Sequence, residues 1–162
     1  MTSEATTTPA PIDRAHLYQP LPPDRAARWD GFGHWDQPLF PTVVGLEVEE
    51  VRVDYARMRL PYRAELQQPA GVVHGGAVAT LIDTVVVPAI GGAYDQIPVM
   101  LTIDMQVRYL GAARDADLVA EGWVVKRGRS IVFCQAEVVS HPERTVVAEG
   151  WLTYRVIVPD DA

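Results

Sequence analysis

The chain has 162 residues, of which 48% are hydrophobic and 22% are charged, and this composition suits one globular domain with a real core. Its formal net charge of −7 argues against general nucleic-acid binding, which needs a basic surface, but leaves room for an anionic ligand held by a few local arginines. The single cysteine, Cys134, excludes an intrachain disulfide and fits a reducing, cytoplasmic setting.

The first 40 residues differ from the rest of the chain. Residues 1–24 are rich in Thr, Pro and Ala without a basic or long apolar run, which excludes a secretory signal and predicts a mobile or loosely wrapped segment. A short helix is expected over 24–35. We therefore divide the chain into an N-terminal extension, 1–40, and a domain, 41–160.

Apolar and polar residues alternate in most of the domain, as in half-buried strands. Two antiparallel strands are expected over 43–61. Four more follow an interruption, at 99–110, 117–127, 130–141 and 144–157. The interruption, residues 71–93, is a long and nearly uncharged run that predicts one helix. Asp83, Pro88 and the lack of flanking basic residues exclude a membrane span there.

One long helix among six strands predicts the α+β class, with an antiparallel sheet of five to six strands wrapped around a central helix. The helix is apolar on most sides, so we expect it to be largely buried. A single curved sheet leaves an edge or a face that needs cover. We therefore expect a homodimer or a homotetramer built as a dimer of dimers.

The helix carries very few groups able to do chemistry. His74 and Asp83 are its only ionisable side chains, and a carboxylate inside a buried helix is costly unless hydrogen-bonded or partly wet. Such an acid is catalytic, is bonded to a nearby hydroxyl such as that of Thr80 or Thr84, or opens onto a subunit interface. Gly75 and Gly76 stand at the predicted helix start, where unpaired N–H groups can stabilise an oxyanion, and His74 alone is typical of a cap.

Other candidates flank the helix. The amide of Gln68 could donate to a carbonyl oxygen, and the hydroxyl of Thr102 could position a water, although both residue types are common in loops and strands. A basic turn, Arg127-Gly128-Arg129-Ser130, suits a phosphate-bearing ligand or is merely a solvated hairpin. Cys/His metal spacing and nucleotide-binding glycine loops are absent.

The run Gly71–Asp83, with its His-Gly-Gly and an acid nine residues after the histidine, and the run Thr102–Leu110 resemble the hot-dog-fold acyl-CoA thioesterases. The resemblance covers about 42–158 and is greatest to the phenylacetate-degradation branch. Relatives often carry Asn where this chain has Gln68.

This resemblance implies hydrolysis of an acyl-CoA at a dimer interface without a metal or cofactor, CoA being part of the substrate. Gly75 N–H and Gln68 would polarise the thioester carbonyl, and Asp83 of the facing subunit would be general base or nucleophile. Thr102 would hold the water, His74 would position the glycines, and Gly76 with the basic turn would bind CoA.

Two other functions fit the same residues. A hot-dog-fold hydratase or dehydratase would pair His74 with Asp83 across the site, and the His-Gly-Gly context favours hydrolysis over it. A non-catalytic acyl-CoA-binding module would be stabilised by CoA esters without releasing thiol.

Overall fold

The computed structural model describes residues 13–159. Its elements, in chain order, are η1 (Ala15–Leu17), α1 (Pro23–Asp30), α2 (Phe40–Val44), β1 (Glu47–Arg52), β2 (Tyr55–Leu60), η2 (Ala64–Leu66), β3 (Gln67–Gln68), β4 (Val72–Val73), α3 (Gly75–Gly91), β5 (Val99–Tyr109), β6 (Asp117–Arg127), β7 (Ile131–His141) and β8 (Val146–Ile157). Within this range no helix has the length and apolar character needed to cross a bilayer.

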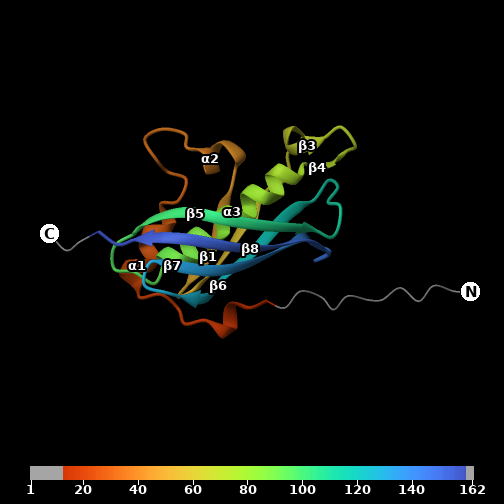
Figure 1. Cartoon of the computed structure of the whole chain (residues 1–162). Helices are drawn as coiled ribbons and strands as arrows, with labels where there is room; N and C mark the ends of the chain where they lie inside the picture. Colours follow the sequence, from red (N-terminus) through yellow and green to blue (C-terminus); the bar gives the residue numbers. More distant parts are fainter. Residues whose placement is uncertain (1–12, 160–162) are drawn as a thin grey trace, which may run out of the picture.

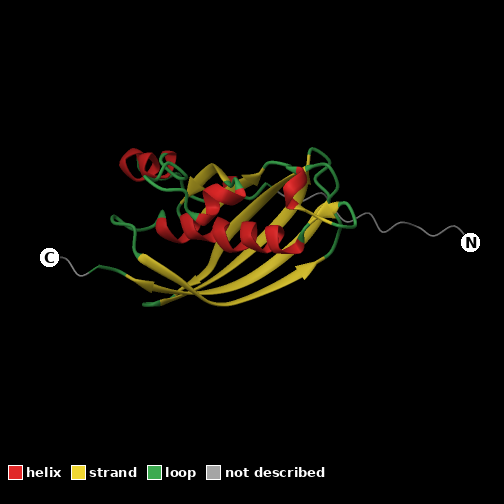
Figure 2. Cartoon of the chain, turned by 90° about the horizontal axis from the view of Figure 1, so that it is seen from above, coloured by secondary structure: helices red, strands yellow, loops and turns green. Residues whose placement is uncertain are grey.

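Six of the strands form one antiparallel sheet in the order β1-β2-β6-β7-β8-β5. The expected α+β class and the long strands are confirmed. The sheet curves around α3, which lies along its concave face (Figures 1 and 2). Helix α3 begins at Gly75, as expected, and residues 72–73 of the apolar run pair with Gln67 and Gln68 in a two-stranded hairpin.

The core lies between α3 and the sheet. Leu81, Ile82, Val85 and Val86 are fully buried along one side of the helix, and alternate strand residues face them. Close approach requires glycine in the sheet: a Cβ on Gly150 would lie 2.5 Å from the Ile82 side chain. The helix is therefore fixed in depth and rotation above the sheet.

The N-terminal region that the structure describes packs on the domain. Trp29 of α1 is buried and lies against Gly91, where a Cβ would be 2.8 Å from its ring. Arg25 and Arg28 donate to the carbonyl oxygens of Ala93 and Tyr94, both at 3.2 Å, just beyond the end of α3, where positive charge is favourable. The expected short helix is confirmed, although α1 ends at Asp30.

One side of the molecule is left open. Strand β5 is an edge strand of the sheet, and its Leu101 and Ile103 are 51% and 56% exposed. The neighbouring face of α3 carries Gly76, which is exposed, and the partly exposed Asp83. An unpaired edge beside a partly apolar helix face is a surface that proteins normally cover.

Candidate functional site

The start of α3 presents one unpaired backbone amide. His74 is the N-cap residue, and its Nδ1 accepts a 2.8 Å hydrogen bond from Gly76 N–H, while its carbonyl oxygen accepts from Ala77 N–H. Gly76 N–H is thus already hydrogen-bonded within the chain. Gly75 N–H has no partner among residues 13–159, so it is the amide that can bind a ligand at the positive end of the helix.

The hairpin of β3 and β4 presents Gln68 beside that amide. Gln68 and Gly75 line the same open groove of about 440 Å³, and Gln68 Oε1 accepts from Ala70 N–H at 3.3 Å, which leaves its NH₂ group as the available donor. Arg114 steadies the turn by donating to the Ala70 and Gly71 carbonyl oxygens, each at 3.1 Å. The geometry places two donors, the Gln68 amide and Gly75 N–H, on one groove.

The adjacent glutamine points elsewhere. Gln67 Nε2 donates to the hydroxyl of Tyr62 at 2.7 Å and to Asp115 at 3.3 Å. The sequence Gln67-Gln68 does not show which amide is free to meet a ligand, and the pairing of the hairpin decides it. Only Gln68 of the two lines the groove.

Tyr109 completes this groove and was not anticipated as a site residue. Its ring lies against Gly75, 3.3 Å from where a Cβ would stand, and its hydroxyl donates to the Gly75 carbonyl oxygen at 2.9 Å. Because an aromatic residue in a strand is usually explained by packing, the sequence carries little signal for this role. We call Gln68, Gly75 and Tyr109 the amide half-site.

Asp83 lies in the middle of α3 and is hydrogen-bonded from the sheet. Thr102 of β5 donates to its Oδ1 at 3.0 Å, and Tyr154 of β8 donates to the same oxygen at 2.6 Å. Thr102 and Tyr154 are directly paired in the sheet, so both hydroxyls reach the helix together. The candidate bonding partners within the helix are not used: Thr80 donates to the Gly76 carbonyl oxygen instead.

Tyr154 is the second site residue that sequence reasoning missed. It is 2% exposed and belongs to the alternating run Leu152, Tyr154, Val156. This pattern predicts an aromatic residue of the hydrophobic core and gives no sign of a role in a site. Burial and the neighbouring Asp83 carboxylate raise the pKa of Tyr154 well above its usual range. The phenol therefore stays protonated and remains a donor. We call Asp83, Thr102 and Tyr154 the carboxylate half-site.

The two half-sites are separate within one chain. Gly75 and Asp83 are eight residues apart on α3, which amounts to about 12 Å along the helix axis. A donor to a carbonyl oxygen and a group acting on the adjoining carbon must each come within about 3 Å of one reacting centre. Within one chain the two groups are therefore too far apart to act on one reacting centre.

The basic turn lies at the other end of α3. Arg127 pairs with Asp54, donates to the Ile90 carbonyl oxygen at 3.2 Å and stacks on the ring of Tyr94 at 4.9 Å. Gly128 N–H donates to Ile131 in the hairpin, and Arg129 and Ser130 are exposed. Arg127 thus braces the fold, whereas Arg129 is open to a ligand.

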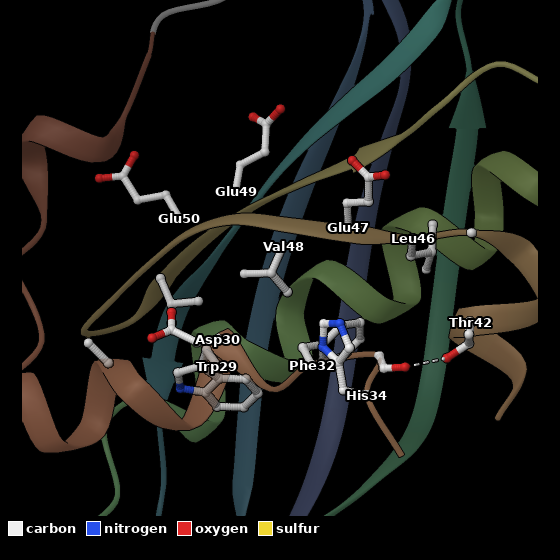
Figure 3. Close-up of a pocket in the computed structure, with 14 residues that line it drawn as sticks. Trp29, Asp30, Phe32, His34, Thr42, Leu46, Glu47, Val48, Glu49 and Glu50 are labelled. Atoms are coloured by element: carbon white, nitrogen blue, oxygen red, sulfur yellow. Dashed lines mark hydrogen bonds between the residues drawn. The ribbon is translucent and has the colours of Figure 1, made fainter. Parts of the chain in front are cut away.

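A second hollow, apart from the groove, contains none of the predicted site residues. It has about 630 Å³ between α1, α2 and β1, with Trp29 and Phe32 on one side (Figure 3). The side chains of Glu49 and Glu50 point away from these rings in Figure 3 and bind Arg57. The lining of the hollow is thus partly apolar and partly polar.

Comparisons with known proteins point to one family. The model of the thioesterase superfamily matches residues 70–147, the segment that contains Gly75, Asp83 and Thr102. The chain is 37% identical over 128 residues to a protein of Halobacterium salinarum named "Putative esterase", covering 72% of this chain and 83% of that protein.

Solved structures agree on the fold. Thioesterase HI1161 of Haemophilus influenzae superposes with a TM-score of 0.74 at 20% identity, over 82% of this chain and 92% of its own. The PaaI protein of E. coli, from the phenylacetic acid degradation operon, gives 0.73 at 16% identity, over 83% and 94%. The hot-dog fold expected from the sequence is confirmed.

Proposed function

Because the chain belongs to the thioesterase superfamily, we propose that it hydrolyses the thioester bond of an acyl-CoA to a free acid and CoA. The observation that carries this proposal is the presence of both required halves in one chain. The amide half-site offers donors for a carbonyl oxygen, and the carboxylate half-site offers an acid held ready by two hydroxyls.

The proposed enzyme is a homodimer in which each site combines halves from two subunits. Two features support this arrangement. The two half-sites are about 12 Å apart along α3, estimated from its helical rise, and the edge of β5 and the neighbouring face of α3 are open to a second subunit. An isologous contact, in which Asp83 of each subunit meets Gly75 of the other, makes the two α3 helices antiparallel.

The chemistry follows from the two halves. A water, or the Asp83 carboxylate itself, attacks the thioester carbon, and negative charge develops on the carbonyl oxygen. Gly75 N–H and the Gln68 amide bind that oxygen. When water attacks, its proton passes to Asp83 and then to the departing sulfur as the C–S bond breaks; when Asp83 attacks, water then hydrolyses the resulting anhydride.

The same antiparallel arrangement supports a place for CoA. If Gly75 of each subunit meets Asp83 of the other, the C-terminal end of one α3, near Ile90, lies beside Gln68 of the other subunit. The exposed Arg129 and Ser130 would then stand next to that groove and meet the CoA phosphates. In this proposal Arg127 holds the turn in place, and CoA takes part only as substrate.

The proposal is tested by incubating the protein with a panel of saturated and aromatic acyl-CoA esters and measuring the release of free thiol. A parallel assay with an enoyl-CoA measures the loss of its double-bond absorbance. We expect thiol release that depends on Asp83: Asp83→Asn should lower kcat by at least about 100-fold, while Glu143→Gln, in the exposed turn between β7 and β8, should not.

Three outcomes would contradict the proposal or a part of it. Loss of the enoyl absorbance without thiol release would identify a hydratase. Thermal stabilisation by CoA esters with no turnover of any of them would identify a binding module. Full activity of Asp83→Asn would refute the role of the carboxylate.

A further inference from the structure

The carboxylate of Asp83 is bonded unequally at its two oxygens. Oδ1 accepts from Thr102 at 3.0 Å and from Tyr154 at 2.6 Å, while Oδ2 accepts no hydrogen bond from residues 13–159. Two hydroxyl donors on one oxygen fix the rotation of the carboxylate about its Cβ–Cγ bond. They also leave the second oxygen with its lone pairs available.

Tyr154 is the more firmly placed of the two donors. It is buried in β8, whereas Thr102 lies in an exposed edge strand. Its hydroxyl also lies 2.8 Å from the backbone carbonyl oxygen of Asp83, so it contacts both the side chain and the main chain of the same residue. A phenol carries one proton, and the shorter distance, to an ionised acceptor, is the stronger bond.

We propose that Tyr154 is a positioning residue that, with Thr102, holds Oδ1 of Asp83 and makes Oδ2 the oxygen that reacts. This inference rests on the proposed thioester hydrolysis. In that reaction Oδ2 takes the proton from water as the new C–O bond forms, or itself forms that bond to the thioester carbon. In either route Tyr154 keeps its own proton and touches no substrate atom.

The surroundings of Asp83 support a role for neutral donors. Tyr154 of β8 donates to Asp83, the buried Cys134 lies on the neighbouring strand β7, and on α3 itself His74 is nine residues away. Burial raises the pKa of the Cys134 thiol to about 12, so it too is neutral. Met58 of β2 belongs to the same apolar cluster as α3, and the cationic Arg127 of β6 bonds to α3 at Ile90, near the far end of the helix.

Tyr154→Phe removes the donor and keeps the ring. We expect kcat to fall about 10-fold or more with KM little changed, because the loss concerns a bond to a charged acceptor and not substrate binding. A merely structural contact would instead lower stability without this selective fall in kcat.

Matched variants isolate the effect. Tyr55→Phe changes another buried tyrosine of the same sheet, one that stacks on Tyr18, and should leave kcat as in the wild type. In the Asp83→Asn background, Tyr154→Phe should cause no further loss, because it acts through Asp83. Thr102→Val removes the other donor to Oδ1; it should lower kcat with KM little changed, and it replaces Tyr154→Phe if that variant does not fold.

Failure of this inference is distinguishable from failure of the proposed function. If the wild type hydrolyses CoA esters and Tyr154→Phe (or Thr102→Val) has an unchanged kcat, the inference is wrong and the function stands. If the wild type is inactive, the ¹³C-carboxyl resonance of Asp83 still tests the contact. Its chemical shift should change in Tyr154→Phe and stay the same in Tyr55→Phe, and identical shifts in the wild type and Tyr154→Phe would overturn the inference.

Discussion

The hydroxyl of Tyr109 donates a 2.9 Å hydrogen bond to the carbonyl oxygen of Gly75, and its ring occupies the space where a Gly75 side chain would begin. Strand β5 is thereby tied to the first residue of α3. This contact does not use the N–H of Gly75, and Gly75 lines the groove that Gln68 also lines. Residue 75 thus has an aromatic ring on one side and, in the proposed reaction, the thioester carbonyl oxygen on the other.

Substitutions at Gly75 can separate these two demands. Gly75→Ala keeps the N–H and adds a Cβ at 3.3 Å from Tyr109, so we expect less than about a 10-fold fall in kcat. Gly75→Pro removes the N–H at a helix position that tolerates proline, and His74 already has the extended backbone that precedes proline. We expect it to fold but to lose about 100-fold or more in kcat. Equal activity of the two variants would refute the role of the amide.

The two glutamines of the hairpin should behave differently. Gln68→Ala removes a proposed donor to the carbonyl oxygen and should lower kcat about 10-fold with little change in melting temperature. Gln67→Ala breaks the bonds to Tyr62 and Asp115 and should cost about 1 kcal/mol of stability while leaving kcat unchanged. Steady-state kinetics and urea unfolding on both variants decide the assignment. The reverse pattern would show that Gln67 is the functional amide.

The two arginines of the basic turn should separate in the same way. Arg127→Ala removes the partner of Asp54 and a donor to the end of α3, so we expect a loss of about 1–3 kcal/mol in the free energy of unfolding. Arg129→Ala should leave stability unchanged and raise KM for CoA esters several-fold. As a control, its KM for a short thioester without the CoA nucleotide should not change. An unchanged KM for CoA esters would place the phosphates elsewhere.

Cys134 should be unreactive in the folded protein. It is buried in β7, and burial raises the pKa of its thiol to about 12, so at pH 8 it is protonated and shielded. A thiol reagent should find close to no reactive thiol in the native chain and one after denaturation. Rapid labelling of the native chain would contradict the buried position of β7.

The sequence predicts more of the fold than of the site. Alternation reveals the strands because one face of the sheet is buried, and the isolated acid reveals Asp83 because a charge in an apolar helix needs compensation. Tyr154 and Tyr109 were missed for the opposite reason. A tyrosine in an alternating strand fits the core by its ring alone, and its hydroxyl partner depends on the strand pairing and on the rotation of α3.

Arg127 illustrates the same difference. The sequence shows a positive charge in a turn, but its partners Asp54 and Ile90 come from segments 73 and 37 residues away. Long-range pairing of this kind is set by sheet order, with β2 beside β6, and local patterns do not report it. The Arg127 guanidinium, which the sequence suggests could bind a ligand, is therefore already bonded within the fold.

The central claim is that each site joins the carboxylate half-site of one subunit to the amide half-site of the other, and heterodimers test it directly. Two differently tagged chains, Asp83→Asn and Gly75→Pro, are combined and the mixed dimer is purified. Each parent should be nearly inactive, whereas the mixed dimer should regain about half of the wild-type activity, since one of its two sites is intact.

The control is a dimer of the double variant, Asp83→Asn with Gly75→Pro, and a wild-type chain, which should be inactive because both shared sites are broken. The reverse result, an inactive first heterodimer and a half-active second one, would show that the site lies within a single chain and would contradict the account.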